Sequence, residues 1–201
     1  MRRFFARMRK KLFGGGVAPR YGVESKDSAA DFDGEELLDE FQVASIRALV
    51  ELLAERLGAE RAAALALRAS QAFETEDSSA MAFATATSLK PDCALSIYVD
   101  WNASSEVEWQ VNRIFETLEL PDRWRWAPGE DRSMAEALRV LENWLSLQGY
   151  HLWHVLTDGD DMLAFPVKTK DAVLAEKLAR EGGMILFTLK DAEPYYGFAS
   201  D

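Results

Sequence analysis

Two apolar runs joined at an Asp-Gly turn constrain the fold of this chain more than any other feature. The runs are YHLWHVLT at 150–157 and MLAFPV at 162–167, and DGDD lies between them. Such a pair is typical of a β-hairpin, because an Asp-Gly turn matches the twist of antiparallel strands. Pro166 has no amide hydrogen, so we expect the second strand to lie at a sheet edge or to end there. The sequence therefore predicts an antiparallel sheet.

Further elements surround the hairpin. CALSIYVD at 93–100 alternates as a half-buried strand does, and Ser105 and Ser133 are each followed three residues later by Glu, the signature of a helix start. The expected elements are a strand at 93–100, helices starting at Ser105 and Ser133, the hairpin, a helix between 169 and 182 and a strand at 184–189. The order β-α-α-β-β-α-β predicts an α+β fold, with an antiparallel sheet covered on one face by helices. This order is compatible with a ferredoxin-like split βαβ arrangement.

Helices are expected before the sheet as well. A capping box at Asp33 and Glu36 opens an apolar helix that ends at Gly58, and an alanine-rich helix follows at 62–72. Residues 74–90 fit either a helix or a loop. The body is thus a single α+β domain at 33–201, with a helical part at 33–90, a sheet-containing part at 91–190 and a short tail.

The first 13 residues, MRRFFARMRKKLF, have a basic amphipathic pattern. Apolar residues recur at helical spacing, and cations fill most of the remaining arc. The residues expected to dock are Phe4, Phe5, Arg7, Met8, Lys11 and Leu12. Three alternatives stay open: docking on an anionic lipid surface or an acidic partner, folding back onto the acidic body, and a solvated tail. The glycines at 14–16 and Pro19 predict a flexible linker, so residues 1–32 form a head and linker.

Charge is divided unevenly along the chain. Seven of the 23 basic residues precede the first acid, Glu24, so the remaining 16 accompany all 34 acidic residues. A body this acidic repels phosphate backbones, which argues against nucleic acid and favours a basic protein partner. No apolar run approaches the length of a membrane span, and the single Cys93 allows no internal disulfide. We expect a cytoplasmic protein, with weak contact at the inner face of the membrane through residues 1–13 as an alternative.

The sequence carries no strong catalytic or metal-binding motif. His151 and His154 would lie on opposite faces of a strand, which is wrong for one shared metal ion, and the aspartates at 158–161 are explained by turn chemistry. Cys93 is expected to be a packing residue. Asp100 with Glu106 and Glu108 is the remaining carboxylate grouping near a strand end. We therefore assign no catalytic residue, metal or cofactor, and lean against an enzyme.

Tryptophan is abundant. Trp109, Trp144 and Trp153 fit core positions of helices or strands. Trp124 and Trp126 lie between arginines in a loop and are less easily buried on one face. Because tryptophan beside acidic groups is favoured at protein interfaces, the candidate binding residues are Trp101, Glu106, Trp124 and Trp126.

Three stretches carry a resemblance to a known family: VDWNASSEVEWQVN, DRWRWAPG and GYHLWHVLTDGDDMLAF. Over roughly residues 92–190 the chain resembles an uncharacterised bacterial family catalogued only as a domain of unknown function. The resemblance implies a bacterial cytosolic α+β domain, and it implies no activity, ligand or catalytic residue.

These observations favour a non-enzymatic acidic binding module, of an immunity or regulatory type, that binds a basic protein partner. The alternatives are a small enzyme with a carboxylate site near Asp100, and a peripheral membrane-surface protein anchored by residues 1–13. The oligomeric state stays open.

Overall fold

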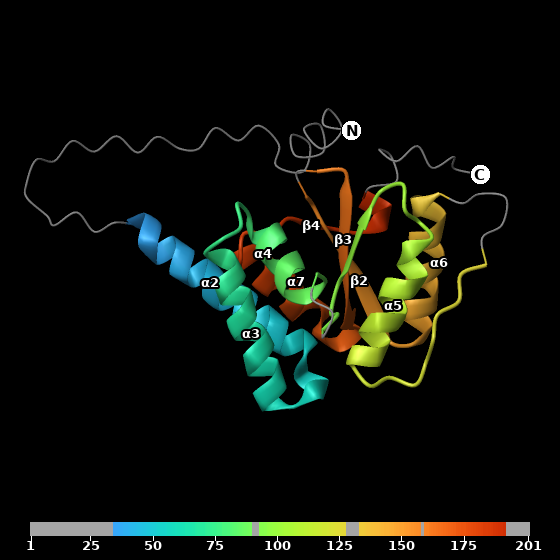
Figure 1. Ribbon diagram of the computed structural model, residues 1–201, viewed down its shortest axis with the longest axis horizontal. Helices are drawn as coiled ribbons and strands as arrows, with labels where there is room; N and C mark the ends of the chain where they lie inside the picture. Colours follow the sequence, from blue (N-terminus) through green and yellow to red (C-terminus); the bar gives the residue numbers. More distant parts are fainter. Residues whose placement is uncertain (1–33, 90–92, 128–132, 158, 192–201) are drawn as a thin grey trace, which may run out of the picture.

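The structure is a computed structural model that describes residues 34–89, 93–127, 133–157 and 159–191, with side chains from residue 40 onward (Figure 1). The helices are α2 Gly34–Leu53, α3 Ala59–Phe73, α4 Ser79–Thr87, α5 Glu106–Thr117, α6 Met134–Leu147 and α7 Ala172–Glu181, with short 3-10 turns η1 Glu55–Leu57 and η2 Thr169–Asp171. The strands are β1 Ile97–Asp100, β2 Tyr150–Val155, β3 Asp161–Lys168 and β4 Leu186–Phe187. The predicted α+β class is confirmed. The predicted head at 1–13, its linker and the Asp33 cap lie outside the described residues.

The four strands form one antiparallel sheet in the order β1-β3-β2-β4. The predicted hairpin is β2–β3, with Trp153 opposite Phe165, and β1 pairs with β3 through Ile97 opposite Ala164. Each parallel pair, β1 with β2 and β3 with β4, is joined by helices and separated by an antiparallel strand. The sheet therefore consists of two interleaved split βαβ units.

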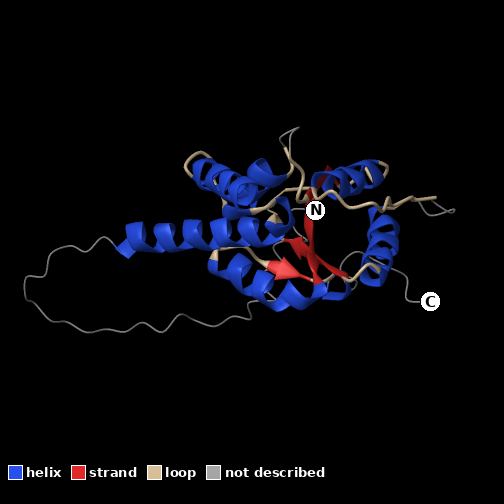
Figure 2. Cartoon of the chain, turned by 90° about the horizontal axis from the view of Figure 1, so that it is seen from below, coloured by secondary structure: helices blue, strands red, loops and turns tan. Residues whose placement is uncertain are grey.

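The position of β4 departs from a ferredoxin-like order, in which the last strand would lie beside β1. Here β4 lies beside β2, on the opposite edge. Because β1 and β3 run in opposite directions, two right-handed crossovers toward the same edge place their helices on opposite faces. Figures 1 and 2 show α5 and α6 on one face and α2, α3, α4 and α7 on the other. The expectation that helices cover one face alone is thus wrong.

Side chains from both helical layers fill the space against the sheet. Phe83 of α4 packs edge-on against Phe165 of β3 at 5.4 Å between ring centroids. On the other face, Phe115 of α5 contacts Trp144 of α6 and Tyr150 of β2. The interior of β3, Met162 to Val167, is buried at every position, as expected for a strand covered on both faces.

Pro166 lies in a central strand that continues to Lys168, so the prediction of an edge strand is wrong. The missing amide hydrogen of Pro166 still limits the pairing of β3. Pro166 pairs with Leu152 on one side, while β1 stops pairing with β3 at Ala164. The missing amide hydrogen therefore falls where β3 has no second neighbour.

The helix starts are partly as predicted. The Ser133 hydroxyl accepts a hydrogen bond from the amide of Glu136 at 3.2 Å, which confirms Ser133 as the cap of α6. Ser105 precedes α5 as expected, but it adopts helical backbone angles and its side chain makes no capping bond. The ambiguous segment at 74–90 contains helix α4, which Ser78 caps by accepting from the amide of Met81 at 3.3 Å.

Helix α2 crosses the end of α7 at very close range. A Cβ placed on Gly182 would lie 2.5 Å from Cδ1 of Ile46, which is fully buried. Only glycine allows this approach, so it fixes α2 against α7. Among the described residues, no helix is long and apolar enough to cross a membrane.

Candidate binding site

Three polar side chains on α5 hold the backbone of neighbouring segments. The Gln110 amide accepts from the amide of Tyr98 and donates to its carbonyl, both at 2.7 Å. Asn112 makes the same reciprocal pair with the backbone of Trp124, at 2.9 Å each way. The Glu108 carboxylate accepts from the amide of Trp126 at 2.9 Å. The EVEWQVN stretch therefore clamps strand β1 and the 124–126 segment onto the fold.

The tryptophans on and beside α5 differ in their burial. Trp124 is 2% exposed and belongs to the core, so the expectation that it resists burial is wrong. Trp109 is 58% exposed with the Arg113 guanidinium 4.8 Å from its ring, so its predicted core position is also wrong. Trp109 lies outside the buried face of α5, which includes Val107, Val111 and Ile114. Trp144 and Trp153 pack against the core as expected.

The remaining candidate binding residues are held at separate places around the start of α5. The amide of Trp101 donates to the carbonyl of Asp160 at the hairpin tip, at 3.0 Å. Trp126 is anchored to Glu108, and both tryptophan side chains pack partly against the core. Glu106 is exposed in the first turn of α5. A role in binding stays a prediction for Trp101, Glu106 and Trp126.

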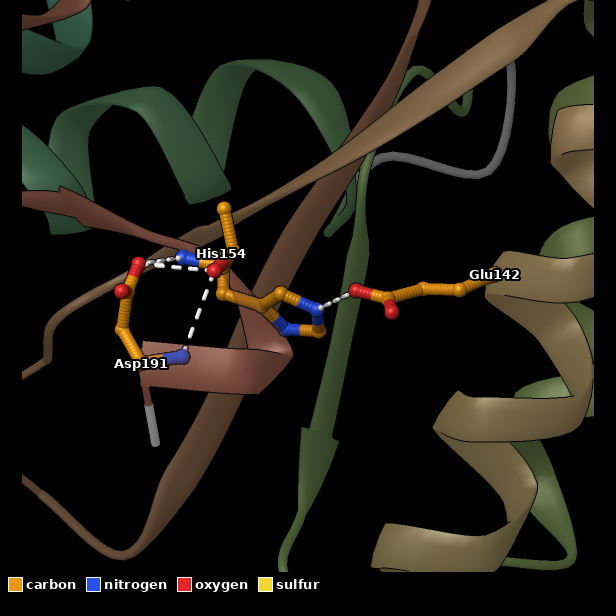
Figure 3. A network of polar contacts seen from close by, with 4 residues as sticks. Glu142, His154 and Asp191 are labelled. Atoms are coloured by element: carbon orange, nitrogen blue, oxygen red, sulfur yellow. Dashed lines mark hydrogen bonds and ion pairs between the residues drawn. The ribbon is translucent and has the colours of Figure 1, made fainter. Parts of the chain in front are cut away.

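The two histidines face opposite sides of the sheet, as predicted. His154 is fully buried, and its Nε2 lies 2.9 Å from Oε1 of Glu142 on α6, toward which the ring points in Figure 3. Its Nδ1 has no hydrogen-bond partner among the described residues. His151 lies beside Trp153 on the other face, where burial lowers the pKa of its imidazole.

Beyond β4 the chain is held by a local cap. The Asp191 carboxylate accepts from the amide and the hydroxyl of Thr188, at 2.9 and 2.7 Å, and Figure 3 draws these hydrogen bonds at Asp191. These hydrogen bonds stabilise the charged form and lower the pKa of Asp191.

Asp100 lies opposite Asp161 at the end of the β1–β3 ladder. The two carboxylates have separate donors: the amide of Asn102 for Asp100 at 2.7 Å, and the Tyr98 hydroxyl for Asp161 at 2.9 Å. Burial, followed by the hydrogen bond to Asp161, raises the pKa of Tyr98 to about 12. In the part of the chain that the structure describes, no three His, Cys, Asp or Glu side chains form a group suited to a metal ion.

An open groove of about 500 Å³ lies between α2 and the α3–α4 turn. Its wall carries three carboxylates, Glu74, Glu76 and Asp77, and its apolar side chains are Val43 and Phe73. Serine hydroxyls and the Gln42 amide complete the lining, and none of the described residues in it is Lys, Arg or His. We call this feature the acidic groove.

Local structure positions the acidic groove. The hydroxyl of Thr85 donates to Oε1 of Glu76 at 2.8 Å, which orients that carboxylate. Gly183, with φ of +81°, lies close to two lining residues, since a Cβ there would lie 2.9 Å from Oγ of Ser79 and 3.4 Å from Nε2 of Gln42. The groove was not predictable from the sequence, because its acids lie in the segment that fitted both helix and loop. The acids at 74, 76 and 77, just before the Ser78 cap, were the one available signal.

A family model described as "Domain of unknown function (DUF6630)" matches residues 45–188. No curated protein and no solved structure gives a significant match. The match begins within α2, so it takes in most of the helical part, whereas the resemblance read from the sequence began near residue 92.

Proposed function

The chain belongs to the DUF6630 family of domains of unknown function, and we propose that it is a binding module whose acidic groove holds a basic segment of a protein partner. The observation that carries the proposal is the lining of the groove, which combines the carboxylates of Glu74, Glu76 and Asp77 with apolar side chains and, among the described residues, includes no cation.

The chemistry of the groove defines the partner. Phe73 and Val43 offer an apolar surface for one aromatic or aliphatic side chain. The exposed carboxylates of Glu74 and Asp77 favour Lys or Arg on either side of that side chain. An amphipathic basic helix supplies both groups on neighbouring turns, so helix-in-groove binding is the mode that fits.

The charge of the whole chain supports the same class of partner. With 34 acidic residues and a net charge of −11, it attracts basic proteins at long range and repels nucleic acid. A regulatory or immunity-type role, in which the module occupies a basic surface of its partner in the cytoplasm, fits this electrostatic design. Strand addition at β1 is disfavoured, because Gln110 already satisfies the outward-facing backbone groups of Tyr98.

The test uses a full-length variant in which the six basic residues of segment 1–13 are neutralised, because folding of that segment back onto the acidic body is one of its open alternatives. In this head-neutral variant, Arg2, Arg3, Arg7, Arg9, Lys10 and Lys11 are replaced by Gln. The probe is a labelled 13-residue amphipathic peptide of Lys and Leu, and the control peptide has Glu in place of Lys. Fluorescence anisotropy should show binding of the Lys peptide that weakens from 50 to 500 mM salt. Equal binding of both peptides, or of neither, contradicts the proposal.

A further inference from the structure

We infer that the first occupant of the acidic groove is the chain's own segment 1–13, which docks there and competes with the external partner. The inference rests on the proposed function, because it assigns a regulator to the same groove. It makes the basic head an autoinhibitory element of the module.

Charge and apolar content match between the two surfaces. Segment 1–13 contains six basic residues and no acid, and its apolar residues include Phe4 and Phe5. In the described part of the chain, the groove lining has three carboxylates and no cation, and its apolar surface comes from Val43 and Phe73. A Phe ring against Phe73, flanked by Arg and Lys opposite the carboxylates, pairs the apolar and the acidic groups of the groove with their complements.

The connection between head and groove is long enough. Residues 14–33 separate the head from α2, and a flexible chain of about 20 residues has a root-mean-square span of about 25 Å. From the start of α2 at Gly34 to Gln42 on the groove wall is a distance of about 12 Å along the helix. The head therefore reaches the groove without strain.

Tethering makes even a weak contact effective. A segment on a short flexible linker has an effective concentration on the order of 1 mM. If the free peptide binds with a dissociation constant of about 50 µM, the tethered head fills the groove about 95% of the time and weakens a competitor about 20-fold. A partner must therefore bind tightly enough to displace the head, which sets a threshold for engagement.

The experiment titrates a synthetic peptide of residues 1–13 into the wild-type chain and into the head-neutral variant. We expect the peptide to bind the head-neutral variant at least about 10-fold more tightly than the wild type. Adding Glu74→Gln and Asp77→Asn to the head-neutral variant should weaken peptide binding. The matched pair Glu116→Gln and Asp122→Asn, which neutralises two exposed carboxylates outside the groove lining, should leave it unchanged.

Three outcomes would overturn the inference. Equal affinity for wild type and head-neutral variant shows that the head does not occupy the groove, while the proposed function stands. Binding of the Lys/Leu peptide but not of peptide 1–13 to the head-neutral variant shows that the head does not fit, and again leaves the proposed function intact. If the wild-type chain binds phosphatidylserine vesicles as tightly as free peptide 1–13 does, the head is available to lipid and is not held by the groove.

Discussion

The side-chain amide of Gln110 makes two 2.7 Å hydrogen bonds to the backbone of Tyr98, one to its amide and one to its carbonyl. Strand β1 is an edge of the sheet, so these backbone groups would otherwise face outward without a strand partner. Helix α5 thus seals the edge with a side chain. A further strand could add at Tyr98 only after these two hydrogen bonds are broken.

Replacing Gln110 by Leu should destabilise the fold by about 2 kcal/mol, because it leaves a donor and an acceptor of Tyr98 without partners. The free energy of unfolding in urea measures the effect. Gln71→Leu, at an exposed position of α3, is the matched control and should change stability little. Equal losses in both variants would show that the edge contact is not stabilising.

Trp124→Ala should cost about 3–5 kcal/mol, since the ring is buried and its removal leaves a cavity. Trp109→Ala should cost less than about 1 kcal/mol, because the exposed ring loses mainly its contact with Arg113. Thermal and urea unfolding of the two variants compare these values directly. A larger loss at Trp109 would contradict the assignment of core and surface on and beside α5.

Gly182→Ala should destabilise the chain by about 1–3 kcal/mol, because the new methyl group overlaps buried Ile46. Ile46→Ala removes the overlapping atoms, so the double variant should lose at least about 0.5 kcal/mol less than the two single losses added together. A double-mutant cycle by urea unfolding makes the comparison. Strict additivity would mean that the two residues are not in contact.

The lowered pKa of His151 predicts how the free energy of unfolding changes with pH. Burial lowers the pKa of its imidazole in the folded chain, so the unfolded chain binds a proton more readily. The stability that this difference provides is present above the unfolded pKa of about 6.5 and is lost as the pH falls below it. Unfolding between pH 7.5 and 5 should therefore depend less steeply on pH in His151→Leu than in wild type. An unchanged slope would show that His151 titrates alike in both states.

The local elements were predictable because their signals lie within a few residues. The Asp-Gly turn gave the hairpin, and Ser133 gave the start of α6. The position of β4 was not predictable, since the sequence does not say toward which edge the last crossover runs, and that choice also decides which face α7 covers.

The candidate site shows the same division. The sequence around Trp124 is typical of a loop. Two hydrogen bonds between the Trp124 backbone and the side chain of Asn112, twelve residues earlier, hold this segment against α5, and the Trp124 ring is buried in the core. The acidic groove combines Val43 with Phe73 and Asp77 from segments that meet only in the folded chain. The spacing of residues in the sequence indicates neither the pairing of Trp124 with Asn112 nor the set of residues that lines the groove. The acidity of the body, in contrast, was evident from composition alone.

The most direct test of the account is the dissociation constant of the Lys/Leu peptide for three full-length proteins that share the head-neutral background. Glu74→Gln with Asp77→Asn should weaken binding about 10-fold at 50 mM salt, because two carboxylates of the acidic groove lose their charge. Glu116→Gln with Asp122→Asn changes the net charge equally and should leave the dissociation constant within about 2-fold of the unsubstituted background. Equal weakening by the two pairs would show that net charge alone attracts the peptide, and would contradict the acidic groove as the binding site.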